Sequence, residues 1–351
     1  MKQPILLAID TSCDDTAAAV TQGTVVLSNV IASQTELHKP YGGVFPTVAK
    51  QAHRENIALC IQKALQKAGV LPSQIEAVAV TQGPGLAPSL EVGIHYGQEF
   101  ATTHQIPVYA LNHLEGHLFS VLAEPNRRIT VPNREIKVQF PAIGLIVSGG
   151  NTLFVKVEDL QSFTVLGSTL DDAAGECLDK IGRMLNLGYP AGPVIEQFAR
   201  LGNPQRFPFP LPLTTVKSFD LSFSGLKTFA RNKLETLEKN GSLDTQTIYD
   251  LCAAAQSGVF RHITYKLEKL LPNQNISELW LGGGVAANST LRRELRKLLR
   301  RVYPNKKVPL RVPYTKRLCM DNAAMIGVAA YANSKNRVHR TQIDRVPRQT
   351  L

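Results

Sequence analysis

Two parts of the chain repeat one order of hydrophobic and polar positions. Residues 5–9 are apolar and precede a loop of small polar residues at 10–16, after which residues 17–20 and 24–31 have the composition of a strand hairpin. Residues 143–147 are again apolar and lead through a glycine-containing loop into a run of alternating apolar and polar residues. Two strand–loop–strand units of this kind predict a duplicated α/β lobe with a ligand cleft between the copies.

Helical and strand patterns alternate over much of the remaining chain. Residues 54–68 place apolar side chains at helical spacing, and residues 75–80 form a short apolar run typical of a buried strand. Helices are also predicted over 171–185 and 244–271, with a proline-rich loop at 204–212 between them. This alternation is typical of an α/β fold.

At 351 residues the chain exceeds what one core commonly supports, so two domains are expected. We predict an N-terminal lobe over residues 1–125 and a C-terminal lobe over residues 126–351, joined by a charged, proline-containing link at 124–140. The final helix, after about residue 321, can pack back on the N-terminal lobe, and residues 334–351 are expected to form a basic tail.

The composition is that of an ordinary globular protein, with 44% hydrophobic and 19% charged residues. No apolar stretch approaches the roughly 20 residues that a membrane helix needs, and the first residues lack the pattern of a secretory signal. We therefore expect a cytoplasmic protein that does not act at a membrane. The five cysteines are scattered and never in CxxC spacing, which argues against a disulfide framework and a thiolate zinc site.

The net charge of +11 is concentrated near the C-terminus. Residues 292–317 contain eleven arginines and lysines against one acid, and residues 334–351 contain five against one. Such a basic surface is typical of a protein that meets a polyanion such as RNA. A solvated helix face and a frayed tail would explain the same charges, and charge alone does not choose between the two interpretations.

His113 and His117 are four residues apart, which on a helix places both imidazoles on one face within reach of one cation. Ordinary core or surface histidines are the alternative. The metalloprotease helix has the order His-Glu-x-x-His, whereas Glu115 stands one position later here, so a zinc peptidase is disfavoured. Asp321, at the start of a run of small residues, is the best third ligand, and its alternative role is a helix N-cap. Two histidines and one carboxylate suit ferrous iron and also zinc.

Two glycine-containing loops offer sites for a nucleotide. Residues 148–152 and residues 282–288 each follow an apolar run, and glycine allows a phosphate, base or ribose to approach the backbone closely. Neither loop has the GxGxxG order of dinucleotide-binding folds, and the chain contains no GxxxxGKS/T phosphate loop. A Rossmann dehydrogenase and a P-loop NTPase are therefore disfavoured.

Together these features resemble one family, the tRNA N6-adenosine threonylcarbamoyltransferases, once labelled O-sialoglycoprotein endopeptidases. The similarity runs from about residue 5 to residue 330 and rests on eight motifs in the family's order. They are residues 10–16 (DTSCDDT), 41–46 (YGGVFP), 112–117 (NHLEGH), 148–152 (SGGNT), 171–176 (DDAAGE), 222–228 (SFSGLKT), 282–288 (GGGVAAN) and 321–322 (DN).

The resemblance implies a duplicated actin-like ATPase fold of the sugar-kinase and actin superfamily, with two lobes around a central cleft. It also implies transfer of the threonylcarbamoyl group of threonylcarbamoyl-AMP to N6 of adenosine 37 in tRNAs that read codons beginning with A, with release of AMP. Because the N6 lone pair is delocalised into the ring, this reaction needs a polarised carbonyl, a held leaving phosphate and a proton acceptor. A divalent metal can supply the first two.

By similarity, the metal ligands are His113, His117 and Asp321, which would bind one divalent metal per subunit, with Fe2+ favoured and Zn2+ the alternative. Asp14 and Asp15 are candidates for proton transfer or for aligning the reacting centre. Without the ordered motifs, the family's substrate-binding positions would more often be turn glycines, solvated acids and a helix cap. These positions, which would hold the nucleotide-linked substrate, are Ile146, Val147, Ser148, Gly149, Gly150, Asp179, Gly192, Glu196 and Asn288.

Four positions depart from the family pattern. Asp10 and Asp15 stand where glutamate is usual, Asn151 stands where histidine is common, and Pro88 replaces a frequent glycine. The two acids keep their charge, so we expect the activity to survive. The carboxylate of Asp15 is one methylene shorter, which bears on its reach.

In bacteria the family enzyme works with a partner paralogue and a small ATPase subunit, while a separate synthase makes the adenylate, and we expect these partners besides tRNA. One alternative is a metal-dependent glycoprotein peptidase, which the position of Glu115 disfavours. Another is a non-catalytic actin-like partner subunit, which would be expected to lose His113 and His117 or the glycine loop at 282–284. A small-molecule kinase of the same fold would not need the two histidines.

Overall fold

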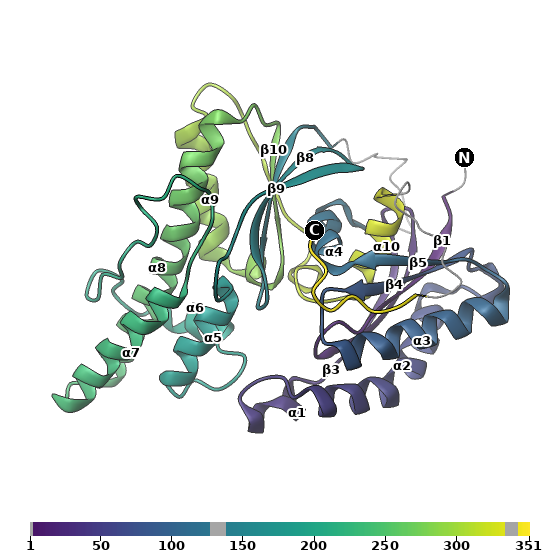
Figure 1. The fold of residues 1–351 in the computed structure, drawn as a ribbon, viewed down its shortest axis with the longest axis horizontal. Coiled ribbons are helices and arrows are strands. Elements are labelled where there is room, and N and C mark those ends of the chain that lie inside the picture. Colours follow the sequence, from purple (N-terminus) through teal and green to yellow (C-terminus); the bar gives the residue numbers. More distant parts are fainter. Residues whose placement is uncertain (1–2, 127–137, 334–342) are drawn as a thin grey trace. The chain divides into compact units, whose positions relative to one another are not determined.

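The computed structural model describes residues 3–126, 138–333 and 343–351 (Figure 1). The chain divides into two compact units. The first unit comprises Met1–Gln139, Glu158–Phe163 and Val312–Leu351, and the second unit comprises Phe140–Val157 and Thr164–Arg311. The chain thus returns to the first unit at Glu158–Phe163 and again from Val312, whereas the sequence pattern placed the lobe boundary at residue 125 and had only the final helix, after about residue 321, packing back on the N-terminal lobe.

A six-stranded sheet lies at the centre of the first unit, in the order β5-β4-β1-β2-β3-β6. The predicted strand and hairpin are confirmed as an antiparallel meander of β1 (Ile5–Asp10), β2 (Asp15–Gln22) and β3 (Val25–Ser33). On the far side of β1, β4 (Ala77–Gly83) and β5 (Val108–Asn112) run parallel to it. The short strand β6 (Glu124–Pro125) pairs with β3 at the other edge.

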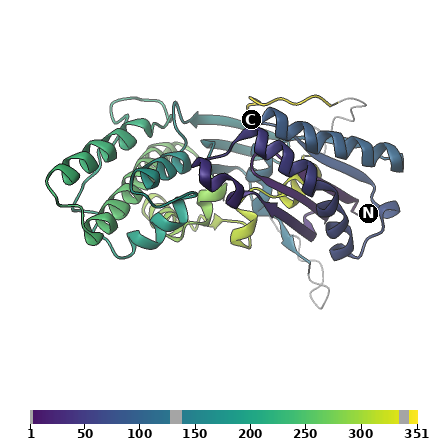
Figure 2. The same ribbon diagram turned by 90° about the horizontal axis from the view of Figure 1, so that it is seen from below.

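Helices α2 (Pro46–Ala68) and α3 (Ala87–His104) cover one face of this sheet and lie in front of its strands in Figure 2. Leu7 and Ile9 of β1 join one hydrophobic cluster with Ile57 of α2 and Leu90 of α3. The intervening residue, Ala8, points to the opposite face, since side chains alternate along a strand.

Helix α10 (Ala323–Ala332) packs on that opposite face, against β1 and β2. A side chain at Gly327 would lie 2.5 Å from the hydroxyl oxygen of Thr21 and 3.2 Å from the Cβ of Ala8, so the helix and the strands are in close contact there. Nearly all of α10 is buried and apolar. Burial of this helix on the sheet places the end of the chain in the first unit.

The second unit repeats the plan with a five-stranded sheet in the order β11-β10-β7-β8-β9. Its strands are β7 (Ala142–Val147), β8 (Thr152–Asp159), β9 (Ser162–Ser168), β10 (Glu278–Gly282) and β11 (Leu310–Arg311). β7 pairs antiparallel with β8 and parallel with β10, just as β1 pairs antiparallel with β2 and parallel with β4. The predicted duplication of an α/β unit is therefore confirmed.

The helices of the second unit gather around its longest helix, α8, which is in contact with α5, α6, α7 and α9. Their bounds are α5 (Ala174–Met184), α6 (Gly192–Ala199), α7 (Ser224–Lys239), α8 (Thr245–Leu270) and α9 (Ser289–Val302). Two short α-helices in the first unit are α1 (Thr35–His38), after β3, and α4 (His113–Phe119), after β5.

Two predicted helices begin at other residues than expected. The helix expected from residue 54 begins at Pro46, because proline is tolerated in the first turn and Ala49, Ala52 and His53 extend the buried face. The helix expected from Asp171 begins at Ala174. Asp171 is used elsewhere, since its Oδ1 accepts hydrogen bonds from the backbone N–H groups at the start of α7.

Part of the predicted link at 124–140 and of the predicted basic tail at 334–351 lies outside the described residues. Among the described residues, no helix has both the length and the hydropathy that crossing a membrane would require.

Candidate functional site

The two histidines lie on α4, a short helix that begins where β5 ends. Asn112 caps this helix, because its Oδ1 accepts a hydrogen bond of 2.8 Å from the backbone N–H of Leu114. His113 and His117 are one turn apart on the same face, and both are buried. Their ring centroids are 4.7 Å apart, so the predicted placement on one helix face is what the structure has.

Asp321, which precedes α10 near the end of the sequence, contacts both histidines. Its Oδ1 lies 3.5 Å from Nε2 of His113 and 3.2 Å from Nε2 of His117. It does not cap α10, since Asn322 does so by accepting a hydrogen bond from the N–H of Met325. Asp321 is therefore not a helix N-cap, and its carboxylate lies beside His113 and His117 instead.

The three side chains offer two imidazole nitrogens and a carboxylate oxygen within 4.8 Å of one another. Both ring nitrogens of His117 are fully buried, and the contact of Nε2 with Oδ1 of Asp321 does not have the geometry of a hydrogen bond. A buried nitrogen that makes no hydrogen bond is costly, and coordination of a cation beside the carboxylate would satisfy Nε2. The residues present therefore fit a metal site with two nitrogen donors and one oxygen donor.

Asp10 and Ser12 contact the outer nitrogen of His113. Nδ1 of His113 lies 3.4 Å from Oδ2 of Asp10 and 3.1 Å from Oγ of Ser12. Asp10 is 1% exposed, and its other oxygen accepts a hydrogen bond from the N–H of Ser12. A carboxylate on the outer nitrogen fixes the orientation of a metal-binding imidazole.

Negative charge dominates the electrostatics of this cluster. Burial opposes a charge on His113, but Asp321 and Asp10 outweigh burial and raise its pKa to about 10. Burial would also raise the pKa of Asp321, yet His113 and His117 lower it. Burial lowers the pKa of His117, although Asp321 opposes this. The cluster thus favours one positive charge near His113, as a proton or as a cation.

Asp14 lies in the loop between β1 and β2, and Asp15 is the first residue of β2. Burial, aided by Asp14 and Asp321 and opposed by Ser33, raises the pKa of Asp15 to about 7. Burial and then Asp321 also raise the pKa of Asp14. Oδ1 of Asp15 is buried and makes no hydrogen bond with a described residue. A carboxyl group with a pKa near neutrality can both give up and take a proton at physiological pH.

The neighbouring thiol, Cys13, is held in its protonated form. Burial raises its pKa well above the usual value, and Asp14 adds to the effect. Glu115 has a structural partner, since its Oε2 accepts a hydrogen bond of 3.0 Å from the side chain of Asn333. Neither residue has the features of a nucleophile or of a metalloprotease base.

In the second unit, the loop after β7 presents an open backbone. Gly149 and Gly150 are exposed, and a side chain at either position would meet nothing within 4 Å. Ser148 shapes the loop, because its Oγ accepts hydrogen bonds from the N–H groups of Gly150 and Asn151. Ile146 and Val147 are buried in β7, so only their backbone could contact a ligand.

Hydrogen bonds connect this loop to the starts of α5, α6 and α9, where the other predicted substrate-binding residues lie or are bonded. These residues are Asp179, Gly192, Glu196 and Asn288. Gly175, at the start of α5, donates its N–H to the carbonyl of Ser148. Oδ1 of Asp179 accepts hydrogen bonds from the N–H groups of Ala191 and Gly192 at the start of α6. Glu196 in turn accepts from the N–H and hydroxyl of Ser289 at the start of α9. Hydrogen bonds therefore link the predicted substrate-binding residues in one connected series, which is called the row below.

Asn288 is the N-cap of α9, which is the structural role considered for it as the alternative to substrate binding. Its Oδ1 accepts from the N–H groups of Thr290 and Leu291, and its Nδ2 donates to Oε1 of Gln256. Asp179 and Glu196 likewise support backbone at helix starts. All three side chains therefore have structural partners, and contact with a ligand would come in addition to these bonds.

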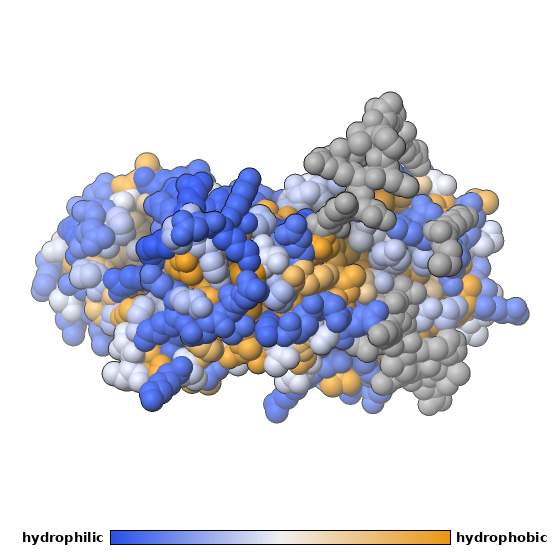
Figure 3. Space-filling model, turned by 90° about the horizontal axis from the view of Figure 1, so that it is seen from above, coloured by the Kyte–Doolittle hydropathy of each residue, from blue (hydrophilic) through white to orange (hydrophobic). Residues whose placement is uncertain are grey.

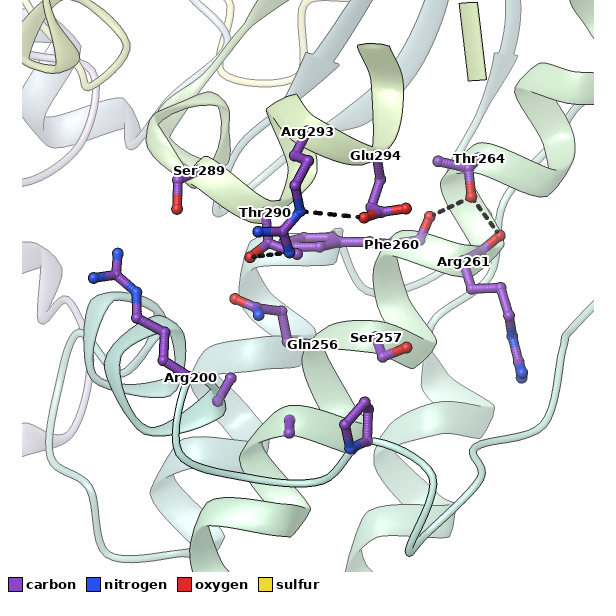
Figure 4. A pocket seen from close by; sticks show the side chains of 13 residues that line it. Arg200, Gln256, Ser257, Phe260, Arg261, Thr264, Ser289, Thr290, Arg293 and Glu294 are labelled. Carbon is purple, nitrogen blue, oxygen red and sulfur yellow. Dashed lines mark hydrogen bonds and ion pairs between the residues drawn. The ribbon is translucent and has the colours of Figure 1, made fainter. Parts of the chain in front are cut away.

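A pocket of about 800 Å³ lies beside Ser289, at the end of this row (Figure 4). Gln256 and Ser257 rise from α8, and Gln256 lies between Arg200 and Arg293 in this view. No sequence motif marked the pocket, because its walls come from three helices that are separate in the sequence. It is lined by Ala199, Arg200, Pro204, Ala253, Gln256, Ser257, Phe260, Arg261, Thr264, Ser289, Thr290, Arg293 and Glu294.

Other proteins are similar to this chain over most of its length. The sequence model of the family described as tRNA N6-adenosine threonylcarbamoyltransferase matches residues 25–328. A relative of that name from Geotalea uraniireducens is 41% identical over 98% of this chain and 95% of its own length. One from Thermosynechococcus vestitus is 42% identical over 99% of this chain and 94% of its own length.

Solved structures show the same fold at low identity. Component A of (R)-2-hydroxyglutaryl-CoA dehydratase from Acidaminococcus fermentans has a TM-score of 0.50 at 13% identity, and the match covers 95% of this chain and 99% of that one. Full-length HypF in its phosphate- and nucleotide-bound form has a TM-score of 0.58 at 14% identity, over 95% of this chain and 47% of that one. These likenesses show the fold alone, which is the predicted actin-like ATPase fold. On its sequence, the chain belongs to the tRNA N6-adenosine threonylcarbamoyltransferase family, as its motifs indicated.

Proposed function

We propose that this chain transfers the threonylcarbamoyl group of threonylcarbamoyl-AMP to N6 of adenosine 37 in tRNAs that read codons beginning with A. Threonylcarbamoyl transfer to adenosine N6 in tRNA is the activity of the family to which the chain belongs, so the protein is an acyltransferase of tRNA modification. The observation that carries the assignment to named residues is the convergence of His113, His117 and Asp321.

The chemistry defines what the residues have to do. N6 of adenosine forms a bond to the carbamoyl carbon, the bond from that carbon to the phosphate oxygen breaks, and AMP leaves with the electron pair. N6 loses one proton. The chain must therefore hold AMP, stabilise charge at the carbonyl and phosphate, and accept a proton.

We assign the AMP part of the substrate to the second unit. The space beside Gly149 and Gly150 is open, so the phosphate could approach the backbone there and meet the N–H of Gly149, while the N–H of Gly150 is bonded to Oγ of Ser148. The rest of the AMP site would be lined by backbone and by three side chains. The backbone is that of Ile146, Val147, Ser148 and Gly192, and the side chains are those of Asp179, Glu196 and Asn288. The pocket beside Ser289 would receive the base, since its volume of about 800 Å³ lies in the range of small-molecule sites.

We assign one divalent cation per subunit to His113, His117 and Asp321, with Fe2+ favoured and Zn2+ as the alternative. When bound, the cation would act as a Lewis acid that polarises the carbonyl and balances charge on the leaving phosphate. Asp10 and Ser12 would orient His113 through its outer nitrogen.

Asp15 is our candidate for the proton acceptor, with Asp14 beside it as an aligning group. A pKa of about 7 leaves a substantial fraction of Asp15 ionised and ready to take a proton at neutral pH. Its chemistry thus suits the loss of the N6 proton.

We assign the tRNA contact to the basic face of α9 and the turn that follows. Leu291, Leu295, Leu298 and Leu299 bury one face of this helix, which turns Arg296, Lys297 and Arg300 outward. On the face drawn in Figure 3, hydrophilic residues predominate over the second unit, with hydrophobic patches among them. Partners would be a paralogue of this chain and a small ATPase subunit, with the cytoplasm as the place of action.

The test is transfer of label from threonylcarbamoyl-AMP to unmodified tRNA by the purified chain with its partners. We expect product with the wild-type chain and none above background with His113→Ala or His117→Ala. Full product with both variants would remove the histidines from the reaction. No product with the wild-type chain, alongside active partners, would favour the non-catalytic alternative.

A further inference from the structure

The last nine residues of the chain form a strap across the end of the first sheet. This C-terminal strap, residues 343–351, passes the carboxyl ends of β4 and β5 in Figure 1. Ile343 is 7% exposed and belongs to the hydrophobic cluster of the first unit. Gln82 at the end of β4 is bonded twice, since its Nε2 donates to the carbonyl of Asp344 and its carbonyl accepts from the N–H of Val346.

Close packing shows that the strap is seated on this edge and not only near it. A side chain at Gly83 would lie 1.9 Å from the carbonyl oxygen of Val346, so only glycine fits there. The N–H of Gly85 donates to the carbonyl of Pro347 at 3.1 Å. Arg345 forms an ion pair with Glu91 of α3.

Two chains of contacts lead from the strap to His113. Along the first, Pro347 holds Gly85, the next residue Leu86 donates its N–H to the carbonyl of Ser12 at 2.8 Å, and Oγ of Ser12 lies 3.1 Å from Nδ1 of His113. A side chain at Gly85 would lie 2.5 Å from that Ser12 carbonyl, which shows how closely the turn and the loop fit.

Along the second chain of contacts, the carbonyl of Thr350 accepts a hydrogen bond of 2.9 Å from Nδ2 of Asn112. Because the amide nitrogen is held in this way, Oδ1 of Asn112 points to the N–H of Leu114 and caps α4. Asn112 is 4% exposed, so water does not readily replace either partner.

The cap matters because α4 is short. It spans His113–Phe119, and its first turn carries His113 itself. A helix of this length has little stability of its own, so its start and direction depend on the cap and on tertiary contacts. A shift of the first turn would move Nε2 of His113 away from Asp321.

We propose that Asn112 is a positioning residue for the metal-binding helix and that the C-terminal strap, through Thr350, holds Asn112 in that role. The inference rests on the metal site of the proposed function but not on which group is transferred. It makes the affinity for the cation depend on residues at the far end of the chain.

The chain offers a matched pair of truncations. A chain ending at Thr350 lacks only Leu351 and keeps an acceptor oxygen for Asn112, now in its terminal carboxylate, whereas a chain ending at Gln349 lacks this oxygen. The probe is Co2+, followed by its visible absorption during titration of the metal-free protein. We expect the first truncation to bind Co2+ like the full-length chain and the second to bind it about tenfold more weakly, the lower end of effects at outer partners of metal ligands.

Point variants separate the two bonds of Asn112. Asn112→Asp keeps an oxygen for the N–H of Leu114 but cannot donate to Thr350, so we expect it to match the truncation at Gln349. Asn112→Ala loses both bonds and should bind Co2+ more weakly still. Circular dichroism and thermal unfolding identify any variant that fails to fold, and Asn112→Asp then provides the comparison.

Equal Co2+ affinity in all folded chains would overturn the inference and leave the metal site standing. An equal loss in both truncations would also overturn it, since Thr350 would then not be the residue that matters. Failure of the full-length chain to bind Co2+ would overturn the metal site of the proposed function together with the inference.

Discussion

Nδ1 of His113 lies 3.4 Å from Oδ2 of Asp10, so the first strand of the chain supplies a carboxylate to the outer nitrogen of a metal-ligand candidate. Asp10 is buried, and His113 together with Ser12 contacts its two oxygens. This arrangement orients the imidazole and makes it a stronger donor.

Asp10→Asn should therefore weaken Zn2+ binding about tenfold or more, because the side chain keeps its shape but loses its charge. Competition with a coloured chelator measures the affinity. Asp159→Asn, the same change at a carboxylate that bonds the N–H of Gln161, is the control and should bind Zn2+ like the wild type. Wild-type affinity in Asp10→Asn would show that His113 does not need this partner.

Asp15→Asn should lower the transfer rate by a factor on the order of 100, the lower end of general-base contributions. A preformed threonylcarbamoyl-AMP substrate restricts the measurement to the transfer step. A wild-type rate in this variant would exclude Asp15 from proton transfer.

The same variant should show a pH-dependent gain in stability. The folded state raises the pKa of Asp15 to about 7, so it favours the protonated form, and stability is lost as the pH rises from the ordinary carboxyl range through about 7. Asn cannot ionise. We expect the melting temperature of metal-free Asp15→Asn to exceed that of the wild type at pH 8 by more than at pH 5, and an equal difference at both values would contradict the raised pKa.

Gly149→Val should fold normally yet bind the adenylate poorly. A side chain at this position meets nothing within 4 Å, and the backbone does not need glycine's left-handed region. The added methyl groups would occupy the space in which we place the phosphate. We expect KM for threonylcarbamoyl-AMP to rise about tenfold, equivalent to about 1.4 kcal/mol of lost binding, with an unchanged melting temperature.

Gly225→Val is the control for that variant, because Gly225 is equally open but lies at the start of α7. It should leave KM unchanged. The same KM in Gly149→Val and Gly225→Val would move the phosphate away from the loop after β7.

Neutralising Arg300, Arg301, Lys306 and Lys307 should weaken tRNA binding and flatten its dependence on salt. Each lost phosphate contact lowers the slope of log K against log salt by about 0.9 on a duplex and about 0.7 on a single strand. Binding curves at several salt concentrations give both quantities. Lys63→Ala with Lys67→Ala, on the exposed side of α2, is the control, and the same loss per charge removed there would mean that the effect comes from net charge alone.

Local sequence patterns were enough for several features. Apolar runs and turn residues predicted the repeated strand–loop–strand units, and the spacing of His113 and His117 predicted two imidazoles on one helix face. The ordered motifs indicated the family and its fold. These signals can be seen in the sequence because each depends on neighbours within a few residues.

The supporting contacts could not be predicted in the same way. Asp10 meets His113, Thr350 meets Asn112, and the pocket beside Ser289 has walls from three helices, all across long separations in the chain. Asp171 looked like part of its own helix but caps α7 instead. The sequence determined which residues carry chemistry, since side-chain type and local spacing set it. Only the tertiary structure decided which of them meet, because hydrogen-bond partners across the chain are chosen when the sheets and helices pack.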